Sequence, residues 1–231
     1  MILTCVDAIR AETGQTTVFL AGHSLGGTLA ALFAALHPDR VKGLILLSAP
    51  LHFGPDVSLF GPIVAAAPPV RELTAVLGNV PGSVLNEVCL LALPVTFDWA
   101  RWLDWLGSLI VPQAPWTHAL VERWTLDELP LLQRLFEDVV EWLYREDRLL
   151  QGNLVIEGKP VTPSQVTAPL VSVVNKRCRL VPPEAVLPLH AAVGSTDKTV
   201  LWYESDIGVA LQHVSMVVGQ HAHRRPCESS L

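Results

Sequence analysis

The first fifty residues alternate between short apolar runs and segments with helical periodicity. Residues 18–21 form a β-branched and apolar run, and residues 41–48 form a continuous apolar run that is typical of a buried parallel strand. Residues 25–36 carry apolar side chains at helical spacing, and residues 2–12 form a further predicted helix. This order of helix, strand, helix and strand predicts an α/β fold with a mostly parallel sheet.

The pattern changes after residue 50 and returns near the C-terminus. Strand signals fade up to about residue 166, where proline-rich loops alternate with helical segments such as residues 126–148. Apolar strand patterns resume at residues 169–174 and 199–203. We therefore predict a core over residues 1–50, a helical cap insertion over 51–166, and a return to the core over 167–231 that includes a histidine loop.

A glycine-flanked serine joins the first predicted strand to the next helix. The sequence Gly22-His23-Ser24-Leu25-Gly26 is a G-x-S-x-G motif with a strand before it and a helix after it. In such a nucleophile elbow the serine adopts a strained backbone, and we expect Gly22 and Gly26 to leave no Cβ that would clash. The Ser24 hydroxyl then lies at the helix N-terminus, where the N–H of Leu25 can donate to an oxyanion. We predict that Ser24 is a nucleophile.

A serine nucleophile requires a general base, because its hydroxyl is protonated at neutral pH. In this architecture the base lies in the loop that follows the last strand, and His213 is placed there. Of the eight histidines, we therefore select His213. His52 and the others lie in turns, in loops or in the C-terminal tail, where a structural role is the usual one.

Composition and charge exclude several classes of function. Half of the 231 residues are hydrophobic, and the formal net charge is -6, with no basic run long enough to line a nucleic-acid groove. The four cysteines, Cys5, Cys89, Cys178 and Cys227, are far apart and show no metal-binding spacing. We interpret them as reduced thiols of a cytoplasmic protein. The N-terminus lacks the pattern of a signal peptide.

The most hydrophobic window, residues 84–112, does not predict a membrane span. Proline and charged residues interrupt it, so no uncharged run reaches the roughly 20 residues that a spanning helix needs. Trp99, Trp102 and Trp105 recur at every third residue and would share a broad helical face. We expect this face to pack on the body of the protein. The alternative is the wall of an acyl pocket or a surface for a hydrophobic polymer.

Several phrases in order along the chain resemble the polyhydroxyalkanoate synthase branch of the α/β-hydrolase superfamily. They are GHSLGG, PGSVLN, LYREDRLLQGNLVIEGKPVTPSQVTAPL, RLVPP and LQHVSMVVG. The elbow alone is specific only to the superfamily, whereas the ordered series is specific to the branch. The resemblance implies an open, mostly parallel sheet with a cap, and acyl transfer from hydroxyacyl-coenzyme A thioesters to a growing polyester.

Two positions depart from the pattern of these synthases. Their nucleophile is usually cysteine, whereas this chain has Ser24, which suits the hydrolysis or transfer of oxygen esters as well. Their triad acid precedes an I-V-P phrase, and Cys178 stands at that position here. Asp206 is the nearest carboxylate before His213, and Asp56 follows the strand that ends near residue 48. Both are candidates for the acid, although a solvated or capping carboxylate is the commoner role.

The elbow comes early, at residue 24. Four strands and a loop with the second oxyanion donor usually precede it in this fold, so the resemblance implies that only the C-terminal half of the sheet is present. Two hypotheses follow: a serine acyl hydrolase or acyltransferase, or a truncated remnant or subunit that needs a partner chain or homo-oligomer. No metal or bound organic cofactor is expected, because the serine carries the covalent chemistry, and coenzyme A would enter only as part of a substrate.

Overall fold

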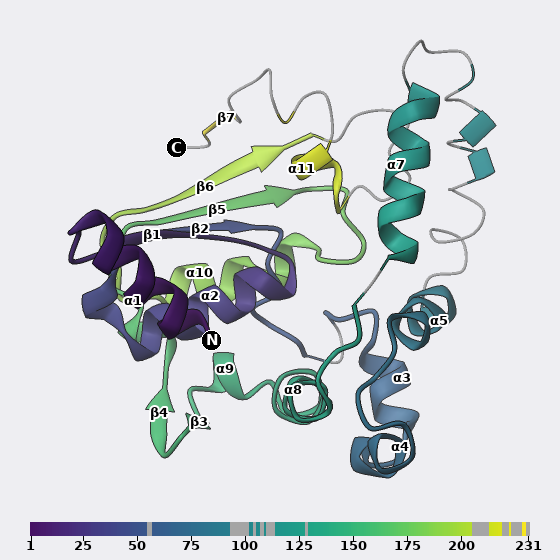
Figure 1. Ribbon diagram of the computed structural model, residues 1–231, viewed down its shortest axis with the longest axis horizontal. Coiled ribbons are helices and arrows are strands. Elements are labelled where there is room, and N and C mark those ends of the chain that lie inside the picture. The colour runs from purple at the N-terminus through teal and green to yellow at the C-terminus, as the bar shows by residue number, and fades with distance from the viewer. Residues whose placement is uncertain are drawn as a thin grey trace. The chain divides into compact units, whose positions relative to one another are not determined.

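A parallel β-sheet is the centre of the first of two structural units (Figure 1). Its strands run in the order β1 (Val18–His23), β2 (Val41–Leu47), β5 (Leu170–Asn175), β6 (Lys198–Tyr203) and β7 (Glu228–Ser229). The first four are parallel, and β7 pairs antiparallel with β6. The predicted α/β fold with an open, mostly parallel sheet is confirmed.

The computed structural model describes most of the chain. The residues outside the description are 55–56, 93–101, 104, 107–108, 110–113, 128, 205–212, 219–221, 223–227 and 230–231. The first unit contains Met1–Phe53 and Asp147–Tyr203, together with β7. The second unit contains Gly54–Glu146 and a later segment that includes α11 (Ser215–Val218).

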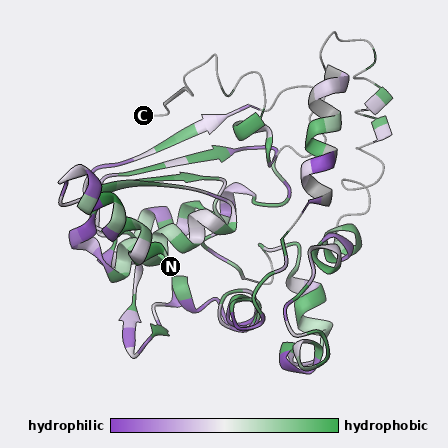
Figure 2. Ribbon diagram, in the orientation of Figure 1, coloured by the Kyte–Doolittle hydropathy of each residue, from purple (hydrophilic) through white to green (hydrophobic). Residues whose placement is uncertain are grey.

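Helices α1 (Ile2–Thr13), α2 (Leu25–Leu36) and α10 (Leu187–Ala192) lie on one side of the sheet (Figure 1). Short 3-10 turns occur at Pro38–Arg40, Pro163–Gln165 and Pro183–Ala185. The buried strand positions on this side include Leu44, Leu46 and Leu170, each 1% exposed. Helix α2 is rich in alanine, which favours helix formation and lets the helix approach the sheet closely. Hydrophobic residues accordingly dominate the strands and α2 (Figure 2).

The opposite side of the sheet keeps apolar side chains in contact with solvent. Phe19 pairs with Gly43 and Ala21 pairs with Ile45 across β1 and β2, so these residues share one face. The side chain of Phe19 is 65% exposed and that of Ile45 is 37% exposed. The Phe19 ring lies over Gly43, where a Cβ would approach it to 2.8 Å. Within the described chain, β1 is also an edge strand of the sheet.

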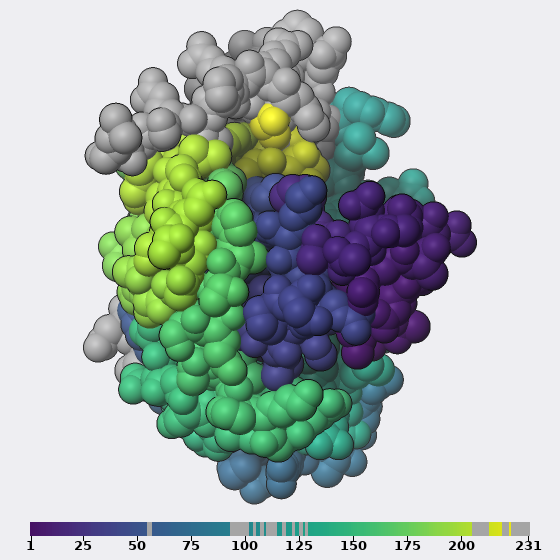
Figure 3. All heavy atoms as spheres, turned by 90° about the vertical axis from the view of Figure 1, so that its left-hand side faces the viewer, coloured from purple at the N-terminus to yellow at the C-terminus, as the bar shows by residue number. Residues whose placement is uncertain are grey.

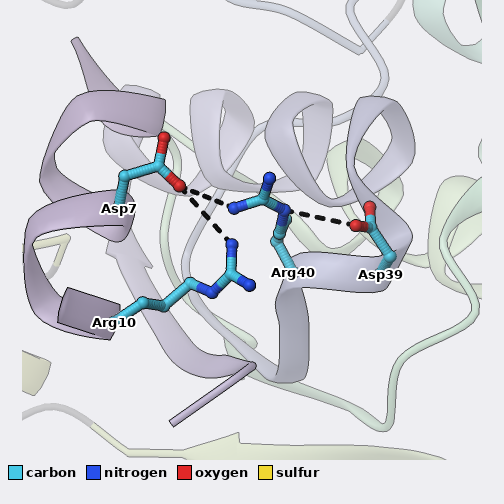
Figure 4. Close-up of polar contacts among 4 residues, drawn as sticks. All are labelled: Asp7, Arg10, Asp39 and Arg40. Atoms are coloured by element: carbon cyan, nitrogen blue, oxygen red, sulfur yellow. Dashed lines mark hydrogen bonds and ion pairs between the residues drawn. The ribbon is translucent and has the colours of Figure 1, made fainter. Parts of the chain in front are cut away.

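An ion-pair cluster joins α1 to the connection between α2 and β2 (Figure 4). The Asp7 carboxylate lies 2.6 Å from the Arg40 guanidinium and 3.5 Å from that of Arg10, while Asp39 lies 3.2 Å from Arg40. α1 and this connection lie side by side at one end of the first unit (Figure 3). Because the groups are partly exposed, we expect the cluster to orient α1 and to contribute little stability.

The chain returns to the first unit at Asp147. This is earlier than the boundary near residue 166 that the sequence predicted. Residues 147–166 belong to the first unit and contain α9 (Arg148–Gln151) and a hairpin of β3 (Leu154–Ile156) and β4 (Lys159–Val161). Each hairpin strand has only three residues, which is too short for a clear alternating pattern. This hairpin packs on α2 through β4. The sequence did not predict it.

The second unit is helical. Its elements are α3 (Gly61–Ala66), α4 (Val70–Leu77), α5 (Gly82–Ala92), α7 (Ala114–Leu126), α8 (Gln133–Asp138) and the π-helix Val139–Arg145, in addition to α11. Of the helical segment predicted over residues 126–148, the structure shows α8 and the π-helix that continues it, so this helix begins at Gln133, later than predicted. No helix in the described part of the chain is long and apolar enough to span a bilayer.

The tryptophan face does not pack as expected. Trp102 is 62% exposed and Trp105 is 42% exposed, and their rings meet edge to face at a centroid distance of 5.7 Å. Trp99 lies outside the described residues. The two indoles therefore contact one another while each keeps a large share of its surface in solvent.

Candidate active site

The elbow has the strained geometry that the sequence predicted. Ser24 follows β1 directly and has φ 53° and ψ -131°, a backbone conformation that is rare for a residue with a side chain. Its N–H donates to the carbonyl of Leu47 at 3.0 Å, which ties it to β2. Its carbonyl accepts the N–H of Gly27 at 2.9 Å, so α2 begins immediately after it. These contacts fix a sharp strand-to-helix turn, and the prediction of strain is confirmed.

Two glycines allow this turn, but they are not the two that the motif suggested. A Cβ on Gly22 would lie 2.5 Å from the carbonyl oxygen of Gly26, and a Cβ on Gly27 would collide with the side chain of Ala49. A Cβ on Gly26 would meet nothing within 4 Å. The expectation that Gly26 relieves a clash is therefore wrong. Gly27 takes that role because it faces the segment after β2, whereas Gly26 faces solvent.

The start of α2 is anchored and its first N–H groups are oriented along the helix axis. The Thr28 hydroxyl is buried and donates to the carbonyl of Pro50 at 2.6 Å. Ser24 itself is partly exposed, so a substrate can approach it. The N–H of Leu25 is one of the first N–H groups of α2, which have no acceptor within the helix. Its predicted role as an oxyanion donor fits this position and stays a prediction.

The predicted base belongs to the other unit. His213 lies in the turn before α11 and is 6% exposed. The adjacent Val214 packs with Val121 of α7 in the core of the second unit. Since Ser24 lies in the first unit, their pairing stays a prediction. The acid candidates Asp206 and Asp56 lie outside the described residues.

Cys178 lies in a buried loop after β5, and its side chain is a thiol in place of the expected triad carboxylate. It is 3% exposed, and burial raises the pKa of its thiol, while the backbone N–H groups of Val181 and Leu180 oppose that shift. The Val181 N–H donates to the Cys178 Sγ at 3.4 Å. The thiol is therefore protonated at neutral pH. Two backbone donors nevertheless face this position, and they would also suit an anion.

The structure shows a histidine–carboxylate pair in the first unit that the sequence did not predict. Nδ1 of His52 lies 2.8 Å from Oδ2 of Asp147, although the two residues are 95 positions apart. No local pattern links such distant residues, and the sequence gave His52 no role. In the described part of the chain, no group of three or more His, Cys, Asp or Glu side chains could hold a metal ion.

Comparison with known proteins supports the same superfamily. The alpha/beta hydrolase fold family matches residues 1–67. A poly(3-hydroxyalkanoate) polymerase subunit PhaC of Haloferax mediterranei is 28% identical over 222 residues, covering 95% of this chain and 44% of that protein. The corresponding protein of Allochromatium vinosum is 26% identical over 227 residues, covering 96% of this chain and 64% of that protein. The chain is similar to these poly(3-hydroxyalkanoate) polymerase subunits over nearly its whole length, and its first part matches the alpha/beta hydrolase fold family.

Comparison with solved structures agrees on the fold. The crystal structure of esterase E22 has a TM-score of 0.51 at 14% identity, and the match covers 95% of this chain and 62% of that one. The chain spans between about half and two thirds of the length of these polymerase relatives. The structural likeness supports the α/β fold.

Proposed function

We propose that this chain is an acyl hydrolase or acyltransferase in which Ser24 is the nucleophile. The observation that carries the proposal is the strained backbone of Ser24, with φ 53° between β1 and the N-terminus of α2. Such strain is retained where it serves a site, because it costs on the order of 1–3 kcal/mol. The turn presents the hydroxyl beside backbone N–H groups that can stabilise negative charge.

The reaction takes two steps. Ser24 Oγ attacks the acyl carbonyl, His213 accepts the serine proton, and the N–H of Leu25 donates to the oxyanion. The bond to the leaving group then breaks, and His213 returns the proton to the departing alcohol or thiol. Water or the hydroxyl of a second acyl chain attacks the acyl-serine and releases Ser24. The first acceptor gives hydrolysis and the second gives transfer.

The substrate class is an ester or a hydroxyacyl-coenzyme A type thioester. The support is the similarity to proteins named as poly(3-hydroxyalkanoate) polymerase subunits. Coenzyme A leaves as the thiol and is not a bound cofactor. Serine in place of the usual cysteine favours oxygen esters over thioester exchange, since a thiolate is the better partner for a thioester.

A fluorophosphonate probe tests the nucleophile directly, because it labels activated serines. Wild-type protein is expected to be labelled, Ser24→Ala to be silent, and His213→Ala to be labelled at least about tenfold more slowly. Ser164→Ala is the matched control, since Ser164 is an exposed serine of the first unit outside the elbow. Equal labelling of all four proteins would refute the proposal.

The acceptor and leaving group are tested with two substrates. A short p-nitrophenyl acyl ester reports hydrolysis, and 3-hydroxybutyryl-coenzyme A reports thiol release together with any polyester formed. Turnover of the ester that is lost in Ser24→Ala supports the hydrolase. Thiol release with sedimenting polymer supports acyl transfer. Absence of both reactions in a folded protein favours the second candidate.

That second candidate is a catalytically impaired chain that requires a further polypeptide segment. The supporting observation is the edge strand β1 with its exposed face, on which Phe19 is 65% exposed. An edge strand with apolar neighbours is a template for another strand. The occupant that fits is a segment that adds a strand beside β1 and covers Phe19 and Ile45, and a second copy of this chain is the alternative outcome.

A further inference from the structure

Two serines follow neighbouring strands at the carboxyl edge of the sheet. Ser24 comes directly after β1, and Ser48 comes directly after β2, its parallel neighbour. The N–H of Ser24 donates at 3.0 Å to the carbonyl of Leu47, the residue before Ser48. The N–H of Ser48 donates to the carbonyl of Val173 in β5 at 2.9 Å, which fixes its position in turn. Ser48 therefore lies beside the proposed nucleophile, within the same unit.

Ser48 shares an unusual backbone conformation with Ser24. Its φ is 40° and that of Ser24 is 53°, in the left-handed region that residues with a Cβ rarely adopt. Among the non-glycine residues that the structure describes, four have a positive φ, and two of these four end neighbouring strands of one sheet. Backbone strain that gathers at one place in this way is a feature of binding and catalytic sites.

The hydroxyl of Ser48 is buried without a hydrogen-bond partner. The residue is 1% exposed, and no group in the described part of the chain bonds its Oγ. Two other buried serines of the first unit differ from it: Oγ of Ser172 lies 2.9 Å from Nδ1 of His190, and Ser195 donates to the carbonyl of Asp197 at 2.9 Å. An unpaired buried hydroxyl lowers stability, because its bonds to water are lost and not replaced. A ligand that supplies the partner explains why it is kept.

The place of Ser48 fits a polar group close to the reacting carbonyl of a substrate. Neighbouring strands lie about 4.8 Å apart. In a 3-hydroxyacyl chain, two C–C bonds of about 1.5 Å each separate the carbonyl carbon from the carbon that carries the hydroxyl. With the carbonyl at Ser24, this hydroxyl can therefore reach a residue on the neighbouring strand. Both hydroxyls donate and accept, so they can pair in either direction.

We propose that the hydroxyl of Ser48 binds the 3-hydroxyl of a hydroxyacyl substrate and thereby determines the specificity of the Ser24 site. The proposal rests on the function proposed for Ser24 and names the substrate group that the site selects. Because the Ser48 hydroxyl has no partner to give up, the new bond favours this substrate over an acyl chain without the hydroxyl. A buried water bound to Ser48 is the competing occupant, and it would give no such preference.

Ligand binding to a chain that cannot react tests Ser48 separately from catalysis. Isothermal titration calorimetry of Ser24→Ala compares 3-hydroxybutyryl-coenzyme A with butyryl-coenzyme A, which differ in one hydroxyl. We expect the first to bind about tenfold more tightly, the scale of one hydrogen bond, and the preference to disappear when Ser48→Ala is added. Ser195→Ala, added in the same way, is the matched control and should keep the preference. It removes a buried serine hydroxyl before β6, at the opposite edge of the sheet.

Equal affinities in Ser24→Ala, no binding of either ligand, or a preference that survives Ser48→Ala would overturn the proposal. Urea unfolding of the single variants gives a second measurement. Ser48→Ala should keep or raise the urea midpoint, because it removes an unpaired hydroxyl, whereas Ser195→Ala should lower it, because it breaks the bond to Asp197. An equal fall in both would assign the Ser48 hydroxyl a structural bond and would also overturn the proposal. Failure of the function proposed for Ser24 shows separately, as wild-type protein that a fluorophosphonate does not label.

Discussion

Gly27 in the first turn of α2 lies against Ala49 so closely that no Cβ fits between the helix and the segment after β2. Gly26, the preceding residue of the same turn, has open space around it. The strand-to-helix turn at Ser24 therefore depends sterically on the glycine that follows the G-x-S-x-G motif, and the two neighbouring glycines provide a matched test.

Alanine substitution of Gly27 and of Gly26 should affect the free energy of unfolding differently. Gly27→Ala is expected to lower the free energy of unfolding by about 1–3 kcal/mol, as overpacking does, and to reduce fluorophosphonate labelling of Ser24. Gly26→Ala should be neutral or stabilise by up to about 1 kcal/mol, because alanine favours the helix. Urea unfolding of both variants measures this. Equal destabilisation would show that the contact with Ala49 does not limit the turn.

Cys178→Asp should increase acyl-enzyme formation if the loop after β5 is the place of the triad acid. The backbone N–H groups that now face the thiol would hold the carboxylate in its charged form, and a charged acid orients the base. We expect labelling of Ser24 to rise at least about tenfold. Cys178→Asn is the control, because it has a similar shape and no charge. Equal rates for both variants would exclude the loop as the acid position.

His190 should make stability depend on pH. It is 8% exposed, its Nδ1 lies 2.9 Å from the hydroxyl of Ser172, and burial, aided by the charge of Lys198, lowers its pKa. As pH falls below the ordinary histidine value of about 6.5, the unfolded chain binds a proton that the folded chain resists. The free energy of unfolding should therefore fall with pH, by at most about 1.4 kcal/mol per unit from this group.

The measurement is urea unfolding between pH 5 and 7.5 for wild type and for His190→Asn. The difference between the two curves isolates His190 from the other histidines. It should shrink as pH falls, because only the wild type loses stability through this group. Parallel curves across the range would contradict the assignment.

The exposed face of the sheet should drive association. Phe19→Glu places a charge among apolar neighbours and should weaken self-association at least about tenfold, measured by sedimentation velocity over a concentration series. Leu129→Glu is the control, since Leu129 is 84% exposed in the second unit. If wild type and Phe19→Glu behave identically, this face has no role in assembly.

The local hydrophobic pattern was sufficient to predict the elements with the clearest periodicity. Helix α2 begins and ends at the residues that its apolar periodicity indicated, and the apolar run after it became β2. The strain at Ser24 also followed from the motif, because a serine between a strand and a helix has few conformations available. The β3–β4 hairpin could not be predicted, since three-residue strands leave almost no periodic signal.

The sequence by itself determined the class of fold, the elbow at Ser24 and the similarity to an acyl-transferring branch, because these depend on residues that are neighbours in the chain. Only the tertiary structure decided which glycine makes room for the elbow and how Asp147 meets His52. Those contacts join residues from distant parts of the chain, such as Gly27 with Ala49 and His52 with Asp147. Packing brings these residues together, and no spacing pattern in the sequence predicts their contacts.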